Sequence, residues 1–151
     1  MRQAATVLLL RESGGELEVL MMRRAAAVAF MGGLWVVPGG RLEAEDHAPE
    51  ALARIPGNAL DACSERLHSL EGERLPPVLA LGLHVAACRE TFEEAGVLLA
   101  RDASGRPCDP GRVARLQARR ATITADPVAF GRMLEEEDLF LDIGPLVYWS
   151  H

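Results

Sequence analysis

The sequence has few cysteines and few aromatic residues, and it shows no metal-binding thiol pattern. Its 151 residues include three cysteines, Cys63, Cys88 and Cys108, and aromatic residues make up 5% of the chain. No Cys-x-x-Cys pair and no zinc-type histidine spacing occur. A small, odd and scattered set of cysteines excludes a disulfide framework and a structural zinc site. A reducing, cytoplasmic location is therefore the expectation.

Basic stretches and long apolar runs are also scarce. The 16 basic residues are outnumbered by 22 acidic ones, which gives a formal net charge of -6. Because nucleic-acid binding depends on basic surfaces that neutralise phosphates, no nucleic-acid partner is expected. No apolar run reaches the roughly 20 residues of a membrane-spanning helix, so no membrane partner is expected either. A small phosphorylated ligand stays compatible with this acidic chain if a divalent cation accompanies it.

The chain does have enough apolar residues for a core, since 49% of it is hydrophobic, and a single domain over residues 1–151 is expected. Short apolar runs between turn residues predict strands, the first two forming a hairpin with one strand well buried. Apolar steps of three and four residues predict helices. The strands are expected at 6–10, 17–22, 34–37, 97–99 and 145–149, and the main helices at 60–70, 78–95, 111–120 and 128–136.

The helix expected at 78–95 combines an apolar stripe with a cluster of acids. Glu90, Glu93 and Glu94 follow the i, i+3, i+4 spacing and therefore share one face, where like charges repel. Magnesium and similar hard cations bind carboxylate oxygens together with substrate phosphates. Arg89 could orient a glutamate or contact a phosphate. The turn at Gly39–Gly40 would let the backbone approach a metal or phosphate closely.

A solvated helix surface is the alternative interpretation, because charged residues are mostly exposed. The complete pattern Arg-Glu-x-x-Glu-Glu-x-Gly favours a site, since five fixed positions match by chance in roughly one window per million. The segment from Arg89 to Val97 resembles the second half of the Nudix box, the signature of a family of metal-dependent hydrolases. Pro38-Gly39-Gly40 resembles the opening of that box, with Gly40 as its first glycine.

The resemblance includes a split box. Asp46 stands where the first glutamate is expected, and about 42 residues instead of seven separate it from Arg89, which indicates an insertion of roughly 35 residues at about 47–77. A long insertion of this kind is similar to the branch that includes peroxisomal coenzyme A diphosphatases. The stretch from Arg24-Ala25 through Phe30-Met31 to Gly40 is also similar to that branch.

The resemblance implies a role for each matching position. Glu93 and Glu94 would bind Mg²⁺ or Mn²⁺, and Glu90 would join them or act through a bound water. The Gly39 carbonyl would complete the coordination. Arg89 would orient a glutamate and serve catalysis together with Glu90 and Glu93, and Asp46 would take the supporting role of the absent glutamate. The candidate substrate-binding residues are Gly40, Arg24 and Arg41.

Several alternatives stay open. The general base is either Glu90 or an acid of the run Glu135–Asp138, which is also typical of a solvated helix end. The resemblance implies an α/β Nudix fold with a mixed sheet between helices, C-terminally incomplete. The leading function is hydrolysis of a nucleoside diphosphate linked to another moiety, with coenzyme A, NADH-like or ADP-ribose-like substrates. The alternative is a nucleotide-sensing module that does not cleave its ligand. A homodimer is left open.

Overall fold

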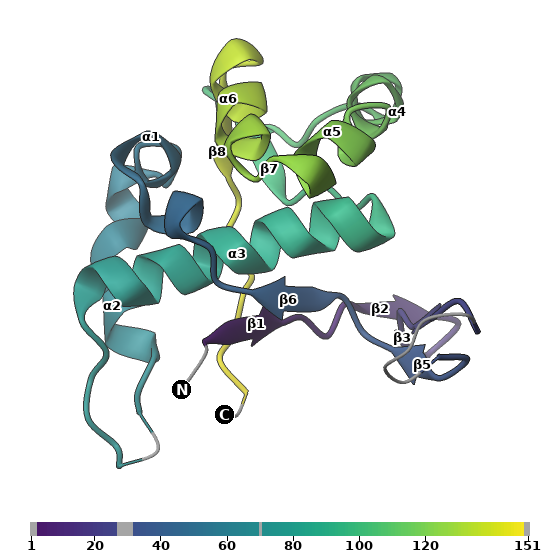
Figure 1. Cartoon of the computed structure of the whole chain (residues 1–151), viewed down its shortest axis with the longest axis horizontal. Coiled ribbons are helices and arrows are strands. Elements are labelled where there is room, and N and C mark those ends of the chain that lie inside the picture. Colours follow the sequence, from purple (N-terminus) through teal and green to yellow (C-terminus); the bar gives the residue numbers. More distant parts are fainter. Residues whose placement is uncertain (1–2, 27–31, 70, 150–151) are drawn as a thin grey trace.

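The structure is a computed structural model that describes residues 3–26, 32–69 and 71–149. The Phe30–Met31 part of the resemblance lies outside the described residues. The long helix α3, Pro77–Ala95, crosses the middle of the molecule (Figure 1). Strands β1 and β6 lie on one side of it, and α4, α5 and α6 lie on the other. Helices α1 and α2 lie near its amino end.

The strands of the described residues pair two by two, and every pair is antiparallel. The pairs are β1 Ala4–Thr6 with β6 Gly39–Arg41, β2 Leu10–Ser13 with β3 Glu16–Val19, β4 Met22–Arg23 with β5 Trp35–Val36, and β7 Ala100–Asp102 with β8 Leu139–Leu141. The predicted first hairpin is present as β2–β3, and Gly14 and Gly15 supply the left-handed backbone of its turn. The expectation of a buried strand there is wrong, because β2 is fully exposed and β3 nearly so.

Helix α3 confirms the strongest helix prediction. Val85, Cys88 and Phe92 are buried along its apolar stripe, and the Phe92 ring lies 6.2 Å from that of Phe130. Pro77 occupies the first turn, where its missing N–H costs no helical hydrogen bond. Gly96 ends the helix in the left-handed conformation, with φ 70°, as predicted. The core therefore places the glutamates at the carboxyl end of a well-anchored helix.

Within the described residues, the region expected as an insertion at about 47–77 contains the α-helices α1 Pro49–Leu52 and α2 Leu60–Arg66 and the 3₁₀ helix η2 Gly57–Ala59. Another 3₁₀ helix, η1 Ala44–His47, leads into it. The later helices are α4 Pro110–Gln117, α5 Arg120–Ala125 and α6 Val128–Glu136. Asp109 caps α4 by accepting from the Arg112 N–H, as its position before Pro110 predicts.

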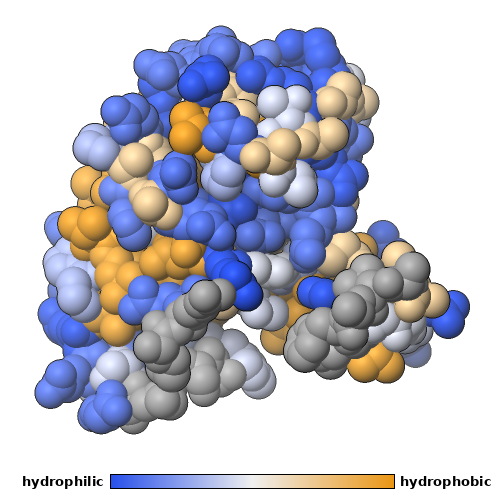
Figure 2. All heavy atoms as spheres, in the orientation of Figure 1, coloured by the Kyte–Doolittle hydropathy of each residue, from blue (hydrophilic) through white to orange (hydrophobic). Residues whose placement is uncertain are grey.

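Three predicted strands differ from the structure. Residues 7–9, the middle of the strand expected at 6–10, lie between β1 and β2. Residues 97–99 precede the pairing, which begins at Ala100 in β7, and described residues 145–149 form no strand. None of the described helices is both long and apolar enough to cross a membrane. Hydrophilic residues dominate the upper surface in Figure 2, whereas the β2–β3 and β4–β5 hairpins expose apolar side chains such as Leu17 and Trp35. Paired strands this short leave much of their apolar surface uncovered.

Candidate active site at the carboxyl end of helix α3

Arg89 and Asp46 form a buried ion pair between α3 and η1. The Arg89 side chain is 3% exposed and that of Asp46 is 1% exposed. Arg89 Nε donates to Asp46 Oδ1 at 2.7 Å, and Nη2 donates to Oδ2 at 3.0 Å. A bidentate arrangement of this type is the strongest that a guanidinium and a carboxylate can form. It joins residues that are 43 positions apart in the sequence.

Helix η1 explains how the short Asp46 side chain reaches Arg89. Asp46 is the third residue of this 3₁₀ helix, and its Oδ2 accepts the Glu43 N–H at 2.9 Å in a capping box. Helix η1 packs directly against α3. The backbone of η1 therefore comes close enough for an aspartate to take the place at which the family has a glutamate.

The remaining donors of Arg89 hold two of the three glutamates predicted to bind a metal. Nη1 donates to Glu90 Oε1 at 2.9 Å and to Glu93 Oε1 at 2.7 Å, and Nη2 donates to the Arg41 carbonyl at 3.0 Å. Burial by itself would lower the pKa of Arg89, but its hydrogen bonds and charge contacts with Asp46, Glu93 and Glu90 raise it well above the usual value. Arg89 is therefore a permanent cation at the centre of the site.

The glycine turn of β6 lies against the glutamates. The Gly39 N–H donates to Glu94 Oε2 at 2.9 Å. A Cβ at Gly39 would lie 2.5 Å from the Ala5 carbonyl oxygen, and a Cβ at Gly40 would overlap the carboxylate of Glu90. Both positions therefore require glycine, and Gly40 provides the space that Glu90 occupies.

The site carries more negative than positive charge. Asp46, Glu90 and Glu93 all contact Arg89, and Glu94 follows on the same helix. Burial raises the pKa of Glu90, Arg89 opposes that rise, and the charges of Glu93 and Glu94 add to it. An excess of carboxylate oxygens in a partly buried place suits a hard divalent cation.

The predicted metal ligands are not gathered into a closed cluster. Among the described residues, no three carboxylate, imidazole or thiol groups lie together in a metal-binding arrangement. Arg89 occupies one oxygen each of Glu90 and Glu93, and the Gly39 N–H occupies one oxygen of Glu94. The donor chemistry fits a hard cation, and the second oxygen of each carboxylate is the atom that would bind it.

Comparison with known proteins decides the family. A family model described as the NUDT19 Nudix domain matches residues 1–151. The chain belongs to this Nudix family. It is 28% identical, over an alignment of 184 residues, to "Acyl-coenzyme A diphosphatase NUDT19" of Gallus gallus, covering 99% of this chain and 49% of that protein. It also resembles the crystal structure of a NUDIX hydrolase from Alicyclobacillus acidocaldarius, with a TM-score of 0.63 and 26% identity.

The match to the Alicyclobacillus acidocaldarius structure covers 95% of this chain and 57% of that chain. Together the two matches show that this chain spans about half the length of the relatives it matches. These findings confirm the α/β Nudix fold predicted from the sequence. In the described residues of this Nudix chain, the sheet takes the form of short antiparallel pairs.

The candidate substrate-binding residues are only partly brought to the Nudix site. Gly40 lies against Glu90. Arg41 contributes its backbone carbonyl to Arg89, while its side chain is exposed. Within the described residues, Arg24 is held through its backbone, which pairs with Gly33 and Leu34 in the β4–β5 region. The structure thus does not bring the Arg24 side chain into contact with the glutamates.

The acids of the run Glu135–Asp138, the alternative candidates for the general base, form ion pairs with arginines outside α3. Glu137 pairs with Arg112 and Arg115, and Glu136 pairs with Arg119. Glu135 and Asp138 lie 4.0 and 3.8 Å from the guanidinium of Arg54. None of the described ion pairs links this run to α3, whereas Glu90 lies on α3 beside Arg89.

Helical spacing predicts that Arg115, Arg119 and Arg120 form one basic, solvated face of the helix expected at 111–120, and this prediction is wrong for Arg120. The side chain instead donates to the backbone carbonyls of Glu93 and Glu94. The break between α4 and α5, just before Arg120, turns it away from its two neighbours. A sequence signal was available, because a cation is favourable at the carboxyl end of a helix, but the partner helix could not be chosen from the sequence.

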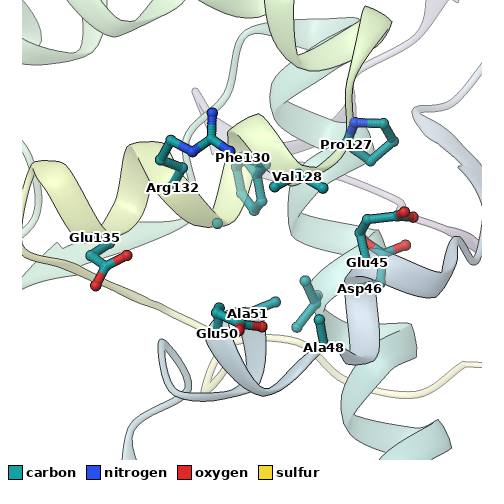
Figure 3. A pocket seen from close by; sticks show the side chains of 12 residues that line it. Glu45, Asp46, Ala48, Glu50, Ala51, Pro127, Val128, Phe130, Arg132 and Glu135 are labelled. Atoms are coloured by element: carbon teal, nitrogen blue, oxygen red, sulfur yellow. The ribbon is translucent and has the colours of Figure 1, made fainter.

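A separate cavity of about 370 Å³ lies between α1 and α6 (Figure 3). Asp46 forms part of the cavity wall, so the cavity adjoins the ion pair between Asp46 and Arg89. Glu45, Glu50 and Glu135 make its rim acidic, with Arg132 as the one basic residue among those that line it. Glu90, Glu93 and Glu94 do not line this cavity, so it is distinct from the Nudix site.

Proposed function

We propose that this chain is a divalent-cation-dependent hydrolase that cleaves the diphosphate bond of a nucleoside diphosphate linked to another moiety. The observation that carries the proposal is the Arg89 network, which holds Glu90 and Glu93 beside the Gly39–Gly40 turn. A buried arginine surrounded by carboxylates at the end of a Nudix helix is suited to metal-assisted hydrolysis rather than to stabilising the fold.

Glu90, Glu93 and Glu94 would hold Mg²⁺ or Mn²⁺ through their carboxylate oxygens. A bound divalent cation neutralises charge on the phosphates and lowers the pKa of a coordinated water. Arg89 keeps Glu90 and Glu93 in place, and Asp46 keeps Arg89 in place. Glu90 is also the candidate base, and in that role the oxygen that Arg89 does not contact would take a proton from water instead of binding the cation. The hydroxyl adds to one phosphorus, the bond to the bridging oxygen breaks, and the products are two monophosphates.

Coenzyme A compounds are the first substrates to test. The Gallus gallus relative is named an acyl-coenzyme A diphosphatase, and its match covers 99% of this chain at 28% identity. NADH-like dinucleotides and ADP-ribose follow as second and third candidates. Each contains the diphosphate on which the proposed chemistry depends.

The test is hydrolysis of these compounds by the purified chain with Mg²⁺ or Mn²⁺, followed by chromatography of the products. Coenzyme A should yield phosphopantetheine and a nucleotide. Glu93→Gln should reduce kcat at least about a hundredfold, because it removes a charge from the proposed metal site. Glu136→Gln, which alters an exposed ion pair on α6, is the matched control and should keep wild-type activity. Full activity of Glu93→Gln would contradict the proposal.

A nucleotide sensor is the second candidate function, favoured by the contacts that Arg89 and Gly39 already make with the three glutamates. These contacts could hold the site closed to a metal. Calorimetry separates the two functions, since a sensor binds its nucleotide with equal affinity in Mg²⁺ and in EDTA and leaves it intact. The hydrolase requires the cation and releases products.

A further inference from the structure

Arg120, the first residue of α5, lies against the end of α3 that carries the glutamates. Its Nε and Nη2 atoms donate to the Glu93 carbonyl at 2.9 and 2.6 Å, and Nη2 also donates to the Glu94 carbonyl at 2.7 Å. Both carbonyls belong to the last turn of α3, where helical carbonyls have no partner within the helix. Arg120 supplies those partners from another element.

Gln117 strengthens the same contact. Its Nε2 donates to the Gly96 carbonyl at 2.9 Å. A Cβ at Gly96 would lie 3.0 Å from Gln117 Nε2 and 3.3 Å from Arg120 Nη1, so the two side chains fit closely around the helix end. A guanidinium at the negative end of the helix dipole is also electrostatically favourable. The carboxyl end of α3 is thus held at three backbone carbonyls, those of Glu93, Glu94 and the capping residue Gly96.

Glu93 and Glu94 connect Arg120 to the Gly39–Gly40 turn and to Arg89. Glu94 is bonded through its backbone to Arg120 and through its side chain to the Gly39 N–H. Glu93 is bonded through its backbone to Arg120 and through its side chain to Arg89. A shift of the last helical turn would therefore move both carboxylates relative to Gly39 and Arg89.

We propose that Arg120 is a positioning residue that fixes Glu93 and Glu94 in the geometry that the site requires. Its effect on catalysis rests on the proposed function, whereas its effect on the Glu94–Gly39 contact does not. Among the described residues, the hydrogen bonds of the Arg120 side chain go to the backbone carbonyls of Glu93 and Glu94, so we assign its effect to the glutamates and not to the substrate.

The experiment compares Arg120→Ala and Arg120→Lys with Arg119→Ala in the full chain. Arg119 is the matched control, because it is the neighbouring residue and its guanidinium pairs with Glu136 on α6 instead of with α3. The readouts are the ¹H–¹⁵N shift and exchange rate of the Gly39 amide, the Mn²⁺ concentration at half-saturation, and kcat and KM for the best diphosphate substrate.

For Arg120→Ala we expect a shifted Gly39 amide, faster exchange, and a half-saturating Mn²⁺ concentration raised about tenfold, as when other residues that support metal ligands are removed. Activity should fall in kcat with little change in KM. Arg120→Lys should lie between the wild type and Arg120→Ala, because one ammonium cannot reproduce the fixed fork of the guanidinium. Arg119→Ala should match the wild type throughout.

The proposal is overturned if the Gly39 amide and Mn²⁺ half-saturation of Arg120→Ala equal those of Arg119→Ala. If Arg120→Ala loses amide protection along all of α3, it has unfolded, and Arg120→Lys then decides by the same readouts. If the wild type hydrolyses no diphosphate, the proposed function fails, but the Gly39 amide still decides whether Arg120 positions Glu94.

Discussion

Two clusters of arginine and acidic side chains within the described residues differ in their balance of charge. At the end of α3, one buried arginine, Arg89, is surrounded by more carboxylates than it can neutralise. Between α4 and α6, arginines and glutamates are matched more evenly, and most of them are at least partly exposed. The first group is Arg89 with Asp46, Glu90 and Glu93, and the second is Arg112, Arg115 and Arg119 with Glu136 and Glu137.

This difference in burial and charge distinguishes the candidate active site at the end of α3 from a surface network of ion pairs. Exposed pairs such as those of α4 and α6 contribute little to stability and need no further partner. Buried carboxylates in excess are costly, because each must lose water without a full counter-charge. The end of α3 therefore has fewer positive charges per carboxylate than the surface network has. A divalent cation would supply the missing positive charge.

The largest effect should come from removing the buried cation. Arg89→Met is expected to lower the free energy of unfolding by about 3–5 kcal/mol, because Asp46 would stay buried without its partner. Urea unfolding followed by circular dichroism measures this change. A loss as small as that of Arg119→Ala would show that the buried and exposed networks do not differ.

A smaller effect is expected from filling the space that Gly40 leaves for Glu90. Gly40→Ala places a methyl group where the Glu90 carboxylate lies, so the glutamate must move. We expect about 1–3 kcal/mol of destabilisation, typical of overpacking, with at least about a tenfold loss of kcat. Gly144→Ala is the control, because its Cβ would meet open space. Unchanged kcat in Gly40→Ala would mean that the position of Glu90 is not critical.

His84 sharpens the comparison, because it is buried on the same helix without a carboxylate partner in contact. Burial lowers the pKa of His84, the hydrogen bond to the Ala80 carbonyl opposes this, and the charge of Arg66 adds to it. The unfolded chain therefore binds the proton more readily, so stability should fall as pH drops below the ordinary value of 6.5. Urea unfolding at pH 7.5 and about 5.5 should show a weaker decline for His84→Gln. An identical decline would refute the assignment.

The sequence predicted the parts of the site that depend on local spacing. The i, i+3, i+4 glutamates, the apolar stripe of α3 and the stop at Gly96 all follow from helical periodicity and backbone conformation. Asp46 was found through the order of box residues, and its contact with Arg89 depended on η1, a short 3₁₀ helix without a clear sequence signal. The contact of Arg89 with a glutamate was expected, but the hydrogen bond from the Gly39 N–H to Glu94 could not be predicted from spacing.

The remaining differences between prediction and structure depend on tertiary packing, which a sequence pattern does not specify. The pattern of β2 and β3 predicted a hairpin correctly, but burial depends on what packs over the strands, and here they are exposed. Residues 145–149 have strand-forming types yet no described partner strand, and pairing cannot be deduced from one segment. Arg120 separates from Arg119 only because α4 ends at Gln117 and α5 begins at Arg120. Helix direction decides which surface each arginine meets.

The smallest effect should come from the exposed network. Arg119 Nη1 lies 2.7 Å from Glu136, and the two side chains are 33% and 50% exposed. Arg119→Ala is expected to lower the free energy of unfolding by less than about 1 kcal/mol, because solvent screens the pair and holding two long side chains costs entropy. The difference from the wild type should disappear in 1 M NaCl, where the screening length is about 3 Å. The effect of Arg89→Met should persist at that salt concentration, because water and ions do not reach its buried carboxylate. Equal salt sensitivity of the two variants would remove the distinction between the buried and the exposed network.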